Sequence, residues 1–197
     1  MLRSRAALLT TAVRLVSESG TTDISVTALA DAANVSRQLV YLQFGDRDAL
    51  LAEAAVDLVT RELIPHIEGV DDERVRALAT ARHFAAYRPF YRAMLTGSCA
   101  FAMTRTLSRS FSVLTRRTVR GLFGELDRQT TEDMTTFLAA GAGAILNGWV
   151  IDGADPLRPD EIAERLLRLA RVFAGRQRRR ARRGRRRRSS RGVARQK

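Results

Sequence analysis

Two serines, Ser25 and Ser36, each stand directly before a short segment with helical spacing of apolar residues. A serine in this position accepts a hydrogen bond from the first turn of a helix, so each one predicts a helix start. Between the segments lies Asn34, a residue type that tolerates the left-handed backbone of a tight turn. Two short helices joined in this way form a helix-turn-helix, whose second helix enters the major groove of DNA.

The side chains at the starts of these helices could form hydrogen bonds with DNA. Arg37 could pair with guanine, Gln38 with adenine, and an exposed Leu39 could meet a thymine methyl group. The helix N-termini add partial positive charge that favours phosphates. The helix pair alone leaves open a second interpretation, a helical corner that binds no nucleic acid. The candidate DNA contacts are Ser25, Thr27, Ser36, Arg37, Gln38, Leu39, Tyr41 and Arg47.

The elements that must position these residues are predicted to be helices. Apolar residues recur at helical spacing almost throughout, and no stretch shows sustained alternation with a period of two. The sequence therefore predicts an all-α fold of about nine helices, with an N-terminal three-helix helix-turn-helix domain and a C-terminal helical effector and dimerisation bundle. The expected ranges are 3–19, 25–33, 36–42, 46 to near 65, 72–86, 89–96, 100–126, 131–152 and 159–174.

The first quarter of the chain resembles the TetR family of one-component transcriptional regulators. The resemblance rests on Leu8-Leu9 with Gly20, on Val26 to Ser36, and on the run from Tyr41 to Leu51. It implies that residues 36–42 are the recognition helix and that Phe44 is a core anchor. It also implies that Tyr41 and Arg47 contact phosphates and that Thr27 contacts DNA from the preceding helix.

Three residues depart from the family pattern. Gln38 and Leu39 stand where the family often has a glycine and a small hydroxyl residue, and Leu42 replaces a common histidine or tyrosine. We therefore expect an atypical operator sequence. Repression is favoured over activation because repressors are more frequent in the family.

Charge divides the chain unevenly. The chain has 34 basic and 21 acidic residues, and residues 176–197 hold 13 of the basic ones and no acid. We expect three regions: a DNA-binding domain over 1–51, a ligand-binding and dimerisation domain over 52–175, and a disordered arginine-rich tail over 176–197. The tail is expected to bind nucleic acid non-specifically, with a merely solvated tail as the alternative. A sequence-blind, nucleoid-type protein acting through this tail is the second functional hypothesis.

Residues 1–51 hold five basic and five acidic residues, so this region has no net charge to attract DNA. We therefore expect the tail to supply additional electrostatic attraction.

In the TetR family the C-terminal bundle encloses a small-molecule pocket, and apolar residues here suit an apolar effector. The alternative is that most of these aromatic residues and methionines are core. The candidate pocket residues are Phe84, Tyr87, Tyr91, Met94, Met103, Leu107, Phe111, Leu114, Asn147 and Trp149.

By the same resemblance, the last two long helices would pair with their copies in a homodimer. Helix 131–152 is apolar nearly all round and is expected to be buried, and helix 159–174 carries an apolar stripe. A twofold dimer predicts a pseudo-palindromic operator in double-stranded DNA. The candidate interface residues are Leu138, Ala142, Ile145, Ile162, Leu166, Leu169 and Phe173.

Other functional classes find little support in the sequence. We find no glycine-rich phosphate loop and no paired histidine ligands, so no catalytic residue, metal or cofactor is predicted. The single Cys99 excludes a disulfide framework and suggests a reducing cytoplasm. As a DNA-binding protein, the chain is expected to associate with the nucleoid there. No apolar segment is expected to be long enough to span a membrane. The preference for arginine over lysine hints at a GC-rich bacterial source.

Overall fold

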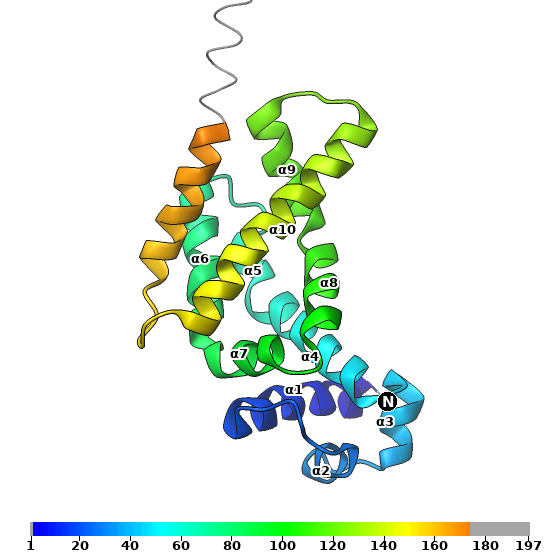
Figure 1. Ribbon diagram of the computed structural model, residues 1–197. Helices are drawn as coiled ribbons and strands as arrows, with labels where there is room; N and C mark the ends of the chain where they lie inside the picture. The colour runs from blue at the N-terminus through cyan, green and yellow to red at the C-terminus, as the bar shows by residue number, and fades with distance from the viewer. Residues whose placement is uncertain (1, 174–197) are drawn as a thin grey trace, which may run out of the picture.

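The computed structural model describes residues 2–173, and the expectations for the tail, 176–197, lie outside the described residues. Within this range every regular element is a helix, which confirms the predicted all-α fold. The N-terminal elements are α1 (Leu2–Ser19), α2 (Val26–Ala32) and α3 (Arg37–Phe44), which together form one end of the molecule (Figure 1).

The remaining helices form a larger bundle beyond α4, which leads out of the N-terminal end (Figure 1). The labelled helices of this bundle are α4 (Arg47–Glu62), α5 (Ile64–Ile67), α6 (Glu73–Ala86), α7 (Arg88–Thr96), α8 (Ala100–Ser110), α9 (Ser112–Phe123) and α10 (Arg128–Asp152). One more helix, over residues 159–173, has no label and is drawn in orange beside α6 and α10.

One apolar core joins the two parts of the chain. α1 packs against α4 and α7, and α4 packs against α8. Leu8 and Leu9 of α1 and Leu50 and Leu51 of α4 are almost fully buried in this core. Burial of this extent is the main stabilising term for a helical domain, so the position of the helix-turn-helix is fixed by the bundle below it.

The predicted helix 100–126 is two helices that meet at Phe111. Hydroxyl groups before this point donate to carbonyls four residues earlier: Thr106 to Ala102, Ser108 to Thr104, and Ser110 to Thr106. Such bonds compete with the helical ladder and often bend a helix. These bonds accompany the break but do not determine it alone, because Thr135 and Thr136 make the same bonds within the unbroken α10.

α10 differs from its predicted environment. It was expected to be buried, but within this chain only Thr135, Leu146 and Val150 are buried. By length and composition alone, α10 is the single helix within residues 2–173 apolar enough to cross a membrane, and 17% of its most apolar window is buried. This corrects the expectation that no apolar segment reaches that length. One such helix is weak evidence for a membrane span.

Candidate nucleic-acid interface and effector groove

The helix-turn-helix is built by the predicted caps. The Ser25 hydroxyl accepts a hydrogen bond from the Ala28 amide at 3.1 Å, and the Ser36 hydroxyl accepts one from the Leu39 amide at 3.2 Å. Asn34 has a φ of 52°, in the left-handed region, and so turns the chain between the helices. Each capping hydroxyl keeps its own hydrogen free to donate, for example to a phosphate.

α3 is fixed on its inner side. Val40 and Phe44 are buried, which agrees with the role of Phe44 as a core anchor. The Arg5 guanidinium lies over the Phe44 ring at 5.2 Å from its centroid and pairs with Glu53 of α4. Gly45, with a φ of 83°, ends the helix in a conformation that favours glycine. The outer side of α3 is therefore held in a defined orientation.

The outer side of α3 carries Arg37, Gln38, Tyr41 and Leu42, all of them exposed. Tyr41 is 54% exposed and Leu42 75%. Leu39 is only half-buried, so it offers less surface to a thymine methyl group than Leu42 does. Sequence reasoning did not name Leu42 as a DNA contact, although its spacing of four residues from Gln38 places both on one face.

Ser25, Thr27 and Ser36 are also exposed, at the starts of α2 and α3. Arg47, at the start of α4, is placed differently. Its side chain is 28% exposed and forms ion pairs with Asp48 and Asp23. It also donates to the Ser98 hydroxyl at 3.3 Å. The hydrogen bond to Asp48 raises the pKa of Arg47.

The N-terminal geometry agrees with comparisons to known proteins. Residues 8–54 match the model of the bacterial regulatory proteins of the tetR family. This N-terminal segment is therefore a DNA-binding domain of the TetR-family type, and the comparisons support a TetR-like transcriptional regulator. The HTH-type transcriptional regulator BetI of Brucella canis is 27% identical over 154 residues, which cover 75% of this chain and 78% of that relative.

Solved structures show the same fold. A TetR-family transcriptional regulator from Streptomyces coelicolor aligns with a TM-score of 0.52 at 20% identity, over 89% of this chain and 80% of that one. A putative family member from Rhodococcus sp. aligns with a TM-score of 0.59 at 18% identity, over 88% of this chain and 100% of that one. At these identities the likeness concerns the fold alone.

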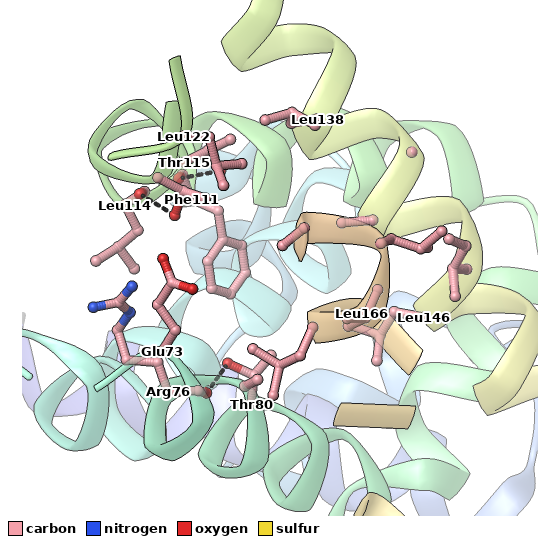
Figure 2. Close-up of a pocket in the computed structure, with 18 of the residues that line it drawn as sticks. Glu73, Arg76, Thr80, Phe111, Leu114, Thr115, Leu122, Leu138, Leu146 and Leu166 are labelled. Atoms are coloured by element: carbon pink, nitrogen blue, oxygen red, sulfur yellow. Dashed lines mark hydrogen bonds between the residues drawn. The ribbon is translucent and has the colours of Figure 1, made fainter. Parts of the chain in front are cut away.

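The C-terminal bundle contains a half-open apolar groove of about 440 Å³. It lies between α6, the α8–α9 junction, α9, α10 and helix 159–173, and Figure 2 shows its lining. Its volume falls in the range of small-molecule sites. Of the candidate pocket residues, Phe111 and Leu114 line the groove.

The other candidate pocket residues do not line this groove. Tyr87, Asn147 and Trp149 lie outside its lining and are half-buried. Five others pack in the core, as the alternative interpretation expected, because their large apolar side chains fill the space between α4, α6, α7 and α8. These five are Phe84, Tyr91, Met94, Met103 and Leu107.

The candidate interface residues lie in two places, the core and the groove. Ile162 is 2% exposed and belongs to the core of its own chain, so it offers no surface to a partner. The other six line the groove: Leu138, Ala142, Ile145, Leu166, Leu169 and Phe173. Sequence spacing placed these side chains on one apolar surface but could not separate a groove wall from a subunit interface.

Two buried side chains in the bundle, His83 and Cys99, have a structural explanation and need no catalytic role. His83 Nε2 lies 2.8 Å from the Tyr91 hydroxyl, and burial lowers the pKa of His83 to about 4. Burial also raises the pKa of the Cys99 thiol, which makes that thiol a poor nucleophile. Across residues 2–173, no group of three or more His, Cys, Asp or Glu side chains is placed to hold a metal ion.

Proposed function

We propose that this TetR-family protein is a homodimeric repressor that binds a pseudo-palindromic DNA operator through α3. The observation that carries the proposal is the outer side of α3, where Arg37, Gln38, Tyr41 and Leu42 stand exposed on a helix whose inner side is locked in the core. Arginine and glutamine recognise guanine and adenine edges in the major groove. Ser25, Thr27 and Ser36 would add phosphate contacts.

The uncovered side of α10 supports dimerisation. Ala140 and Ala144 of α10 are exposed and lie outside the groove lining, as does Val172 of helix 159–173, which is 58% exposed. A second copy packed on α10 and helix 159–173 would cover these side chains, and twofold symmetry would present two α3 helices to DNA. The expected half-sites are then about 34 to 36 Å apart.

The groove supports control by a small, largely apolar effector. The walls of the groove include α10 and α6, both of which contact α7, and α7 packs on α1 of the DNA-binding end. At the end of α7, Gly97 packs closely against the Thr22 side chain, next to the helix-turn-helix. An effector would release DNA by favouring a conformation in which the two α3 helices no longer match the operator spacing.

Selection from a pool of random-sequence DNA tests this proposal, at about 0.15 M salt to suppress non-specific contacts. We expect a palindromic consensus that is lost in Arg37→Ala and retained in Arg14→Ala, a matched change on the exposed side of α1. Enrichment without a consensus would contradict the proposal. If a chain ending at residue 175 then lost all binding, the sequence-blind alternative would be established.

A further inference from the structure

The groove presents more hydrogen-bond acceptors than free donors. Three of its polar side chains are threonines, and each hydroxyl donates to a carbonyl of its own helix. The donor–acceptor distances are 2.9 Å for Thr80 to Arg76, 3.0 Å for Thr115 to Phe111 and 3.3 Å for Thr118 to Leu114. With its hydrogen committed in this way, each hydroxyl oxygen faces a ligand as an acceptor.

The two charged residues of the groove are not equivalent. Arg76 donates to the backbone carbonyls of Val70 at 2.6 Å and Asp71 at 3.1 Å, so the α5–α6 loop holds one end of its guanidinium. The Glu73 side chain forms no hydrogen bond or ion pair with any other described residue. In Figure 2 the Glu73 carboxylate reaches toward the Phe111 ring. Glu73 is therefore the charged side chain of the groove with no partner among the described residues, whereas Arg76 is anchored through Nη1 and keeps Nε and Nη2 as further donors.

We propose that the groove binds an apolar molecule with a cationic, hydrogen-bond-donating head, such as a primary amine, and disfavours the matching carboxylate. This inference rests on the proposed function, because it takes the groove as the effector site. An ammonium at Glu73 would form a charge-assisted hydrogen bond and would also meet the face or edge of the Phe111 ring. The apolar body would lie along Leu138, Ile145 and Leu166.

Three probes with one shape and different heads test the proposal: 4-phenylbutylamine, 4-phenylbutanol and 4-phenylbutyrate. We would titrate each into the full-length protein at neutral pH by calorimetry. Since a hydrogen bond to a charged group is worth about tenfold in affinity or more, the amine should bind about tenfold more tightly than the carboxylate. The alcohol should lie between them.

Two variants locate the effect. Glu73→Gln should remove most of the preference for the amine, whereas Glu68→Gln, an exposed carboxylate outside the groove lining, should leave it unchanged. Thr115→Val should weaken the amine and the alcohol. Its control is Thr96→Val, because the Thr96 hydroxyl makes the same kind of bond, to Arg92 at 2.8 Å, outside the groove.

The outcomes separate this inference from the proposed function. Equal or tighter binding of the carboxylate, an unchanged preference in Glu73→Gln, or no binding of any probe would overturn the inference. Operator affinity, measured separately with and without the amine, tests release. If the amine binds with the expected preference but leaves operator affinity unchanged, the inference stands and the proposed release mechanism fails.

Discussion

The guanidinium of Arg47 joins parts of the chain that lie far apart in sequence. It pairs with Asp23 before α2 and Asp48 in α4, and it donates to Ser98 between α7 and α8. The family resemblance makes this residue a phosphate contact, but its charge is already compensated by two carboxylates. We therefore expect Arg47 to act mainly by holding the helix-turn-helix against the bundle.

Arg47→Ala distinguishes these roles. Operator affinity should fall because the α1–α2 loop loses its support, but the slope of log affinity against log salt should stay the same. Arg61→Ala removes an arginine that is likewise paired on α4 and should change neither quantity. A slope smaller by about one for each lost contact would show that Arg47 neutralises a phosphate after all.

His83 should make stability depend on pH. In the folded protein, burial lowers the pKa of His83 from its ordinary value of 6.5 to about 4, and the negative charge of Glu62 raises it by a smaller amount. The His83 ring faces Tyr91 and Tyr87. Between these two values the unfolded chain binds the proton more readily, so stability is full above pH 6.5 and falls as pH drops toward 4.

His83→Gln keeps a hydrogen-bonding amide near Tyr91 but cannot titrate. Urea unfolding at fixed protein concentration should show the wild type losing about 3 kcal/mol more than this variant as the pH is lowered from 7 to 4. His66→Gln, at an exposed histidine, should follow the wild type. Parallel losses in wild type and His83→Gln would contradict this origin of the pH dependence.

Among the elements, the carbonyl end of α10 is held by a single side chain. Arg88, at the start of α7, donates from Nε to the Val150 carbonyl at 3.0 Å and from one terminal nitrogen to the Gly153 carbonyl at 2.6 Å. The last carbonyls of a helix lack hydrogen-bond donors within the helix. Arg88 supplies the missing donors through charge-assisted hydrogen bonds. It ties the groove-lining α10 to the helix that reaches α1.

Arg88→Ala should lower the free energy of unfolding by about 3 kcal/mol, since it leaves half-buried carbonyls without a charged donor. Arg92→Ala, at an exposed position of the same helix, should cost much less. Chemical denaturation of both variants at one protein concentration measures the difference. Similar losses for the two would show that the contacts of Arg88 add little.

Elements set by nearby residues could be predicted from the sequence, and those set by distant ones could not. The caps at Ser25 and Ser36 and the left-handed Asn34 each depend on residues within one turn, and the structure has all of them. The break at Phe111 could not have been foreseen from the hydroxyl residues before it, because Thr135 and Thr136 make the same bonds within the unbroken α10. Whether α10 is covered depends on packing that its own apolar pattern does not encode.

The candidate sites follow the same division. Arg37, Gln38 and Tyr41 were predicted as contacts because they lie in the first turns of the second helix, and all three are exposed, whereas Leu39, also expected to be exposed, is half-buried. The pocket was not located, because Phe84 and Tyr91 have the composition of a pocket lining and of a core alike. Which apolar side chain faces a groove is decided by tertiary contacts between helices far apart in sequence.

At the scale of the whole molecule, the DNA-binding end and the groove lie in different parts of the chain, joined through α4 and α7 (Figure 1). The proposed dimer would bring two copies of α3 to one face of DNA. Any change in the bases that α3 recognises must then appear twice in the operator, once in each half-site. This symmetry gives the account its most demanding consequence.

The most direct measurement is the operator consensus of Gln38→Arg compared with that of the wild type, from the same random DNA pool and salt. If α3 reads bases as a twofold pair, the consensus should shift toward guanine at one position in each half-site and stay unchanged elsewhere. A consensus identical to that of the wild type, or a shift in one half-site only, would contradict recognition by two symmetric α3 helices.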